Sequence, residues 1–255
     1  MKRSDTFSAY RRMIATHDDS VVNWWYSGWT FVQIEGQPHI PLMQIMAIMT
    51  YRTETLSSDS FRIHWSEIGV FKDPATGEIP DVWINPLTGA HVQPPRTFQE
   101  GPGQTTITST PNGLRIDIVQ PHATLREASV RFDEAHGRLG FTQRELKLRG
   151  FPTPDGRLPP PGSPAGFEGI TELSFFASLE DLAKPAHESL AVQGIYSFVL
   201  IGLPPWMGFG ELTGRTVTRG RITRGVPNEQ LDRVAWQRLA TLFPNEIAQP
   251  PATRR

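Results

Sequence analysis

The 255-residue sequence has no cysteine, no long apolar run and almost no net charge. Without thiols, the chain has no disulfide framework, no thiolate nucleophile and no cysteine-based metal site. No segment approaches the ~20 apolar residues of a membrane span, and the start of the chain lacks the apolar core of a signal peptide. The formal net charge of -1 offers no basic field for nucleic acid or a membrane surface. We therefore expect a cytoplasmic protein with no nucleic-acid or membrane partner.

The sequence also lacks the short motifs that hold common cofactors. It contains no GxGxxG or GxxxxGK[ST] phosphate loop and no GxSxG nucleophile elbow. The seven histidines are scattered, with no HxH or HxxxH pair. A metal site assembled from distant strands is the alternative. We predict no metal, flavin or nucleotide cofactor.

Turn-forming residues, by contrast, are dense in residues 73–95, DPATGEIPDVWINPLTGAHVQPP. Residues 73–77 and 85–89 are near-copies of one turn, DPATG and NPLTG. Asp or Asn can bond the backbone two residues on, Pro pre-sets φ, and Gly supplies a positive φ at the exit. This pattern predicts a hairpin in which residues 78–85, with Trp83, form a short strand.

Most of the remaining chain shows strand patterns. In residues 61–71, Phe61, Ile63 and Trp65 alternate with polar residues. Residues 41–56 carry three methionines and could form a helix, but their polar tail favours a strand. The other predicted strands are residues 21–36, 104–110, 113–120, 127–134, 138–150, 170–179, 190–202 and 214–225.

About ten turn-linked strands need two packed sheets or a barrel. We predict a mainly β fold: one domain over residues 1–255, with an ordered core at about 20–245. Its sheet forms an antiparallel, calycin-like barrel, closed or partly open. A capped apolar stripe predicts a C-terminal helix at residues 227–244, and residues 4–17 predict a short N-terminal helix. Residues 152–164 are proline-rich and predict a surface loop.

The paired turns also carry a family resemblance. The order Glu67, residues 73–78, Trp83 and residues 85–89 resembles the signature of DUF1838, a bacterial family of unknown function. The segment LPPWMGFGELTGR resembles the closing segment of that family, so the likeness would extend over residues 22–243. The resemblance implies little about activity, because the family is defined by its pattern rather than by a reaction.

Aromatic residues suggest where a site would lie. Seven tryptophans among β-type segments either fill a core or line a flat pocket for an aromatic ligand. His64 shares a strand face with Arg62; if that face points to solvent, both are ordinary surface residues. Glu67 faces the other way, where we expect it to pair with an arginine. The predicted catalytic residues are His64, Tyr51, Tyr196 and Arg62, and the predicted substrate-binding residues are Trp25, Arg52, Trp65, Trp83, Asn85, Phe198 and Trp206.

These features leave three classes of function open. The first is a cofactor-independent lyase that releases formaldehyde from a hydroxymethyl side chain of a plant-derived, lignin-type phenolic aromatic, with an isomerase or dehydratase as its near alternative. The second is a non-catalytic, calycin-like binding protein for an apolar aromatic ligand. The third is an interaction module with a filled barrel. We predict the lyase, with a small aromatic substrate as its partner, in a homodimer.

Overall fold

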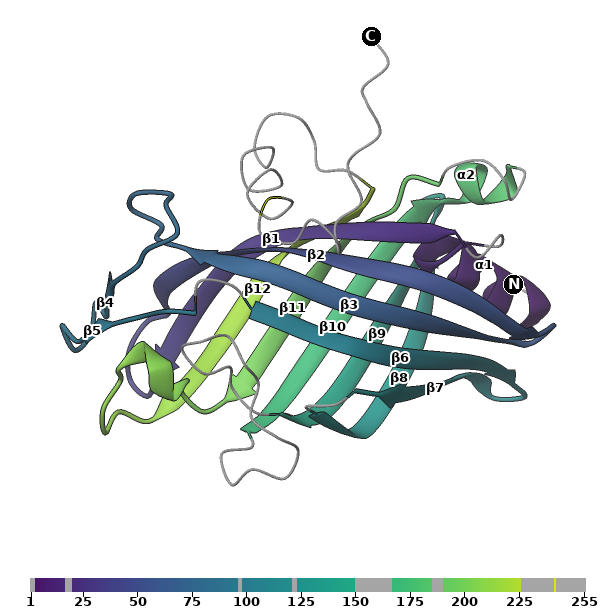
Figure 1. The fold of residues 1–255 in the computed structure, drawn as a ribbon. Helices are drawn as coiled ribbons and strands as arrows, with labels where there is room; N and C mark the ends of the chain where they lie inside the picture. The colour runs from purple at the N-terminus through teal and green to yellow at the C-terminus, as the bar shows by residue number, and fades with distance from the viewer. Residues whose placement is uncertain are drawn as a thin grey trace, which may run out of the picture.

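The computed structural model describes residues 3–16, 20–95, 98–120, 123–149, 167–184, 190–225 and 241 (Figure 1). The protein is mainly β, and its ten long strands form a nearly closed antiparallel barrel, which confirms the predicted class. The barrel strands are β1 (Val21–Ile34), β2 (Ile40–Ser57), β3 (Ser60–Lys72), β6 (Phe98–Thr110), β7 (Gly113–Val119), β8 (Ala123–Ala135), β9 (Arg138–Arg149), β10 (Phe167–Ser178), β11 (Gln193–Ile201) and β12 (Gly214–Arg224).

The barrel is an up-and-down meander in which consecutive strands lie side by side. The strand order is β7-β6-β3-β2-β1-β12-β11-β10-β9-β8, so the last strand pairs with the first. The two ends of this order, β7 and β8, meet at a seam, where a single bridge joins Gln120 and Ala123. This seam is why the barrel is nearly closed rather than closed.

Alternation along each strand decides which side chains face the interior. On β3, Phe61 and Ile63 are buried and inward, whereas Arg62 and His64 are partly exposed and outward. The methionine-rich segment forms β2, as its polar tail predicts, because it pairs along its length with both β1 and β3.

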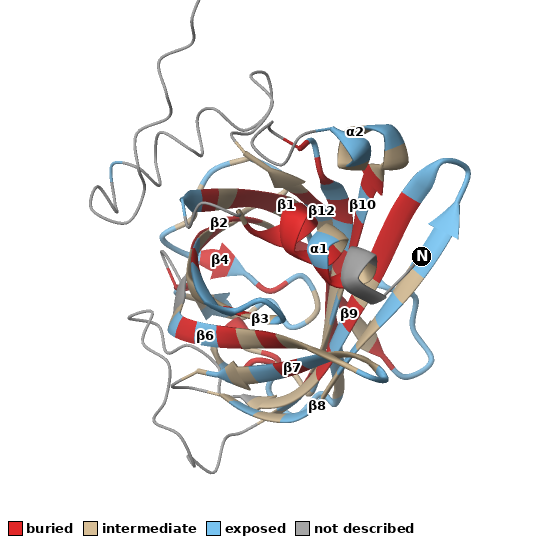
Figure 2. Ribbon diagram, turned by 90° about the vertical axis from the view of Figure 1, so that its right-hand side faces the viewer, coloured by how far each residue is buried: buried red, intermediate tan, exposed pale blue. Residues whose placement is uncertain are grey.

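The N-terminal helix α1 (Arg3–Ile14) closes one end of the barrel (Figure 2). It inserts Phe7, Tyr10 and Met13 into the main core, and the Tyr10 ring lies 4.5 Å from that of Phe141 on β9. The expected short N-terminal helix is thus present. A second helix, α2 (Leu179–Ala183), is capped by the Ser178 side chain. The predicted C-terminal helix, except helical Thr241, and the predicted proline-rich loop lie outside the described residues.

The opposite end carries the paired turns (Figure 1). Both turns form, but the predicted strand at residues 78–85 is wrong in length: only β4 (Trp83–Ile84) pairs, with β5 (His91–Val92). The paired segments β4 and β5 flank the second turn, at residues 85–89, so residues 78–82 after the first turn have no paired strand beside them in the described structure. Here a separate core cluster contains Trp83 and Met207 of the 3-10 turn η1 (Pro205–Met207).

Truncating Met13 tests whether α1 stabilises the barrel as its plug. Met13 is fully buried, so Met13→Ala should lower the free energy of unfolding by about 2–5 kcal/mol. Ser8 is exposed on the same helix, and Ser8→Ala should change it by no more than about 0.5 kcal/mol. Urea unfolding followed by circular dichroism measures both values. Equal effects of the two substitutions would contradict the plug.

Candidate active site

A cavity of about 200 Å³ lies inside the barrel. Its wall includes Tyr10 and Ile14 of α1 and Trp206 and Met207 of η1, so it extends from the end closed by α1 to the end that carries η1. A cavity of roughly 150 Å³ is enough to hold benzene. The space inside this barrel therefore suits an aromatic ring with small substituents.

All of the chain's tyrosines face this cavity. The sequence has four tyrosines, and Tyr10, Tyr26, Tyr51 and Tyr196 are all among the lining residues. They come from α1, β1, β2 and β11, elements that are far apart in the sequence. The fold thus gathers every phenol group of the chain in one place.

Two facing glycines make room for the tyrosine rings. Gly28 on β1 and Gly220 on β12 are paired in register, and Tyr196 is the partner of Gly220 on its other side. A Cβ atom on Gly220 would lie 2.6 Å from Cε1 of Tyr196 and 2.0 Å from the carbonyl oxygen of Ser27. Only a residue without a side chain fits there, so the Tyr196 ring can lie against the barrel wall.

The first polar group in the cavity consists of Tyr26, Glu67 and Tyr196, the carboxylate–phenol cluster. The Tyr26 hydroxyl donates a hydrogen bond to Oε1 of Glu67, and the Tyr26 and Tyr196 rings meet edge to face at 4.8 Å. The Tyr196 hydroxyl is buried, yet no described residue provides it with a hydrogen-bond partner. A buried hydroxyl in this state costs about 1–3 kcal/mol, which a ligand could recover.

Burial also sets the protonation of the tyrosines. It raises the pKa of Tyr196 well above its usual value, and the nearby Glu67 carboxylate raises it further. Burial, followed by the charge of Glu145, likewise raises the pKa of Tyr51. Both hydroxyls therefore keep their protons at neutral pH, which favours roles as hydrogen-bond donors over roles as tyrosinate bases.

The second polar group is the lysine–carboxylate network of Tyr10, Gln143, Glu145 and Lys147. Tyr10 donates to Oε1 of Gln143 at 2.8 Å, and Nε2 of Gln143 donates to Oε1 of Glu145. The Lys147 ammonium lies 2.5 Å from Oε2 of Glu145, and both side chains are largely buried. A buried ion pair of this kind is satisfied internally and resists separation.

Aromatic side chains form much of the remaining wall. Trp65 on β3 donates from Nε1 to Oγ1 of Thr105 at 3.2 Å, which fixes its ring plane. Trp206 packs against Phe71 with ring centroids 5.3 Å apart. Phe198 on β11 also lines the cavity. Five of the predicted site residues thus meet here, namely Tyr51, Tyr196, Trp65, Phe198 and Trp206.

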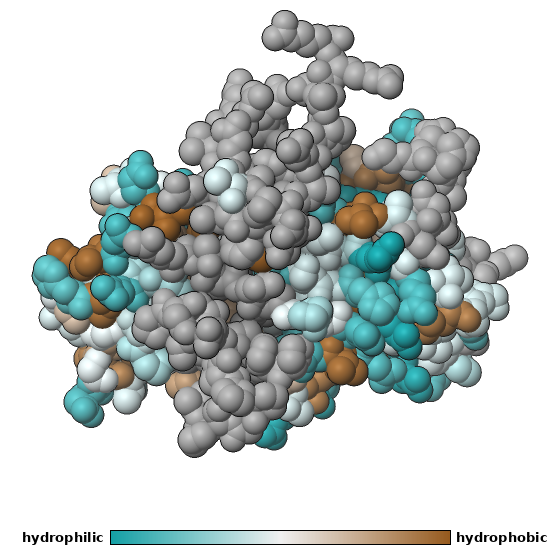
Figure 3. Space-filling model, in the orientation of Figure 1, coloured by the Kyte–Doolittle hydropathy of each residue, from teal (hydrophilic) through white to brown (hydrophobic). Residues whose placement is uncertain are grey.

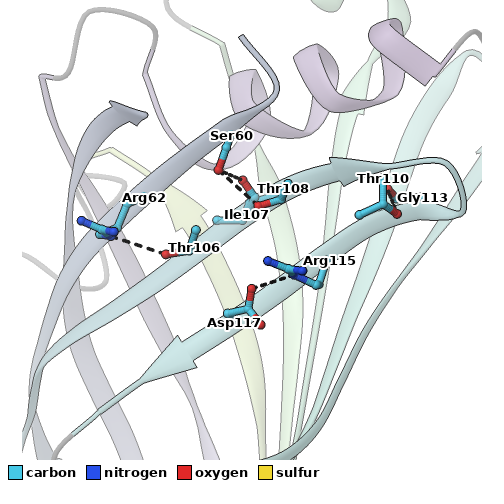
Figure 4. Close-up of polar contacts among 9 residues, drawn as sticks. All are labelled: Ser60, Arg62, Thr106, Ile107, Thr108, Thr110, Gly113, Arg115 and Asp117. Atoms are coloured by element: carbon cyan, nitrogen blue, oxygen red, sulfur yellow. Dashed lines mark hydrogen bonds and ion pairs between the residues drawn. The ribbon is translucent and has the colours of Figure 1, made fainter. Parts of the chain in front are cut away.

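Three of the predicted polar residues lie on the outer face instead. His64 and Arg62 both contact Oε2 of Glu54, at 3.0 and 3.1 Å, and Arg52 is exposed next to His64 on the neighbouring strand. Arg62 also reaches Thr106 of β6 on the outer side of the barrel (Figure 4). Hydrophilic residues gather over this part of β3 (Figure 3). Alternation places them opposite Trp65, so they do not face the cavity.

The other three predicted residues lie outside the cavity as well. Trp25 is buried on the outer side of β1 with Met46 and Ile68, and Trp83 belongs to the cluster below η1. Asn85 is fully buried and has a positioning role. Its Nδ2 donates to the carbonyl oxygen of Met207 at 2.7 Å, so the second turn holds the segment that carries Trp206.

Several cavity residues escaped prediction from the sequence. Glu67 lines the cavity and accepts a hydrogen bond from Tyr26, a role that its predicted pairing with an arginine did not include; that pairing stays a prediction. Glu67 lies two residues after Trp65 on the same strand, and this spacing predicts that both side chains lie on one face. No local sequence pattern places Tyr10, Glu145 and Lys147 at the same site as Glu67, because α1 and β9 come close to β1 and β3 only in the folded barrel.

Comparison with known proteins supports the family resemblance over part of the chain. The model of a family of proteins of unknown function, DUF1838, matches residues 18–96. This stretch includes Tyr26, Tyr51, Glu67 and both turns, whereas the expected continuation to residue 243 lies beyond the match. No curated protein matches the chain.

In the described part of the chain, no group of three His, Asp or Glu residues could hold a metal ion. None of the described helices is long and apolar enough to cross a membrane. The absence of a cofactor, the cytoplasmic location and the homodimer stay predictions.

The twin turns allow a matched test of the role of Asn85. Asn85→Ala should lower the free energy of unfolding by about 2–3 kcal/mol, because it removes the bond to Met207 and leaves a buried carbonyl unsatisfied. Asp73 accepts the same local turn bond, from Ala75 N at 2.7 Å, but is less buried, so Asp73→Ala should cost only about 0.5–1.5 kcal/mol. Urea unfolding compares them. A loss at Asn85 no larger than that at Asp73 would refute the positioning role.

Proposed function

We propose that the protein is a cofactor-independent lyase that acts on a small, lignin-type phenolic aromatic and releases formaldehyde from a hydroxymethyl side chain. The observation that carries this proposal is the carboxylate–phenol cluster: a partly buried carboxylate and a buried phenol hydroxyl without a described partner face an aromatic-lined cavity. The cluster supplies a base and a hydrogen-bond donor on the wall of this cavity.

The cavity wall suits the proposed substrate. Trp65, Trp206 and Phe198 offer flat apolar surfaces for an aromatic ring, beside the two polar groups described above. Pockets of this composition bind apolar ligands and fix their orientation through a small number of hydrogen bonds. A one-ring phenol fits in this volume of about 200 Å³.

The proposed reaction needs no external electron acceptor, because the substrate supplies its own. A phenolate pushes electrons into the benzylic position and expels a benzylic hydroxyl as water, which leaves a quinone methide. A base then removes the proton of the neighbouring hydroxymethyl O–H, the C–C bond breaks, and formaldehyde leaves. The bonding electrons return through the quinone methide to the phenolic oxygen, which regains a proton. The products are one water, one formaldehyde and one conjugated phenol.

We assign the role of base to a carboxylate and the role of hydrogen-bond donor to a protonated tyrosine. Glu67 is the base that we propose for the hydroxymethyl proton, since Tyr26 already donates to one of its oxygens and orients it. Tyr196 keeps its proton and donates to the departing hydroxyl or to the developing oxyanion. Positioned acid–base groups of this kind each contribute roughly 10²–10⁴-fold in rate.

The reaction is tested with a phenolic dimer that bears adjacent benzylic hydroxyl and hydroxymethyl groups. We expect stoichiometric formaldehyde together with new absorbance from the conjugated product. Glu67→Gln and Tyr196→Phe should each lower kcat by roughly 10²–10⁴-fold. The matched control is His64→Gln on the outer face, which should leave turnover unchanged.

Two outcomes would overturn the proposal in different ways. Binding of the dimer without formaldehyde would make the protein a carrier of aromatic compounds rather than a lyase. Turnover that survives both cavity substitutions but falls in His64→Gln would move the chemistry to the outer face of β3.

A further inference from the structure

Lysine is scarce in this chain, and one of its few lysines lies in the cavity. The sequence has four lysines and 21 arginines, so arginine is its usual basic residue. In the described part of the cavity wall, however, the one basic side chain is that of Lys147. The two residue types differ in their chemistry, because a guanidinium keeps its proton in proteins, whereas an amine can lose it and then attack a carbonyl group. The reaction proposed above gives Lys147 no task.

Lys147 has a carboxylate within reach of a direct proton transfer. Its Nζ lies 2.5 Å from Oε2 of Glu145, and the two side chains are only 12% and 5% exposed. Gln143 donates to the other carboxylate oxygen, Oε1, and so orients Glu145, while the amine also donates to Oε1 of Gln120 at 3.4 Å. Burying two charges is costly, and a proton that passes from the ammonium to the carboxylate removes both. The pair can therefore present a neutral amine beside a carboxylic acid.

The wall next to Lys147 leaves room for a ligand. In the strand register, Lys147 on β9 is paired with Gly169 on β10, which in turn is paired with Leu200 on β11. Lys147 and Leu200 both line the cavity. Strands lie about 4.8 Å apart, so the backbones of Lys147 and Leu200 are about 10 Å apart, and the glycine places no side chain between them in this row. The row suits a flat ring that lies over Gly169 and brings a carbonyl carbon to the amine.

We propose that Lys147 captures small aldehydes in the cavity as a protonated imine, with Glu145 as its proton carrier. This inference rests on the proposed function only in taking the cavity as the ligand site. It adds a second reactive group, at a place other than the carboxylate–phenol cluster, and a class of ligand that this group recognises. Formaldehyde, the product of the proposed reaction, is the smallest member of that class.

The capture is balanced without an oxidant or a reductant. The ammonium passes a proton to Oε2 of Glu145, and the Nζ lone pair then bonds to the carbonyl carbon while the carbonyl oxygen takes that proton. Nζ gives a second proton to Glu145, which passes it to the new hydroxyl group. The hydroxyl leaves as water, and the nitrogen lone pair forms the C=N bond. The product is a positively charged imine beside the Glu145 carboxylate, so the ion pair is restored.

Reductive trapping tests the capture. The protein is incubated with 4-hydroxybenzaldehyde and sodium cyanoborohydride, which reduces the imine to a stable secondary amine, and mass spectrometry of peptides follows the label at each lysine. Lys184 is the internal control, because its Nζ also lies 2.5 Å from a carboxylate oxygen, Oδ1 of Asp181, but its side chain is exposed. Lys147 should be labelled roughly 10-fold faster or more, because binding in the cavity holds the aldehyde next to the amine. Labelling of Lys147 no faster than that of Lys184 would overturn the inference.

Competition and substitution then assign the label to the cavity. 4-Hydroxybenzyl alcohol, which cannot form an imine, should protect Lys147 and leave the labelling of Lys184 unchanged; a Lys147 label that the alcohol does not reduce would refute the inference. Lys147→Arg keeps a cation beside Glu145 but should abolish the label at this position. Glu145→Gln keeps the shape without the proton carrier and should slow the labelling of Lys147 by roughly 10²-fold or more. An unchanged rate in a Glu145→Gln protein with the circular dichroism of the parent would overturn the role of Glu145.

The two proposals fail separately in these experiments. Selective labelling of Lys147 without any formaldehyde from the phenolic dimer would overturn the lyase and support the capture of aldehydes. Formaldehyde release by a protein whose Lys147 is not labelled selectively would overturn the capture and support the lyase.

Discussion

The pairing of β12 with β1 is the constraint on which the rest of the structure depends. It joins the N-terminal and C-terminal strands into one ten-stranded sheet, and the register of that sheet fixes for each strand which alternate residues face the interior. On β1 it directs Trp24 and Tyr26 inward and Trp25 outward, so three consecutive aromatic residues enter two different clusters. A shift of one residue in this register would exchange the two sets. The facing glycines, Gly28 and Gly220, lie in this same pair of strands, where a side chain would force them apart.

The curving of this sheet into a nearly closed barrel also creates an interior, which side chains must fill or leave as a cavity. Barrels of eight to ten strands hold either packed side chains or a small-ligand cavity. Here α1 fills one end with Tyr10 and Met13, and η1 covers the other with Trp206 and Met207. The space between them contains polar groups that are costly to bury unless they are bonded. Several are bonded to one another, whereas the buried Tyr196 hydroxyl has no partner among the described residues. Exceptions of this kind are typical of functional sites rather than of stable cores.

The barrel could be predicted from the sequence because its signals are local. Strand alternation, turn residues and the helix pattern of α1 each depend on neighbours within a few residues. The inward face of β3 was harder, because Arg62 and His64 alternate with Phe61 and Ile63 and either face could in principle bear a site. His64 favoured the outer face as the predicted site, because histidine can transfer protons at neutral pH. In the structure the more apolar face of β3 turns inward, and Glu67 lines the cavity on that face with Trp65. The meeting of Tyr51 with Glu145, or of Glu67 with Tyr196, joins strands across the barrel, and no local pattern encodes it.

The turns explain why the first part of the chain depends on the last. The stretch that matches DUF1838 contributes Tyr26, Tyr51 and Glu67 to the cavity, and its second turn places Asn85 against η1. Thr88 of that turn donates to the carbonyl oxygen of Gly208 at 2.8 Å, so two side chains hold the backbone on either side of Gly208. Trp83 also stabilises this segment, because it packs in the same core cluster as Met207. The hydrogen bonds of this turn thereby support a site that the turn does not line, because they hold the backbone of η1, which places Trp206 in the cavity wall.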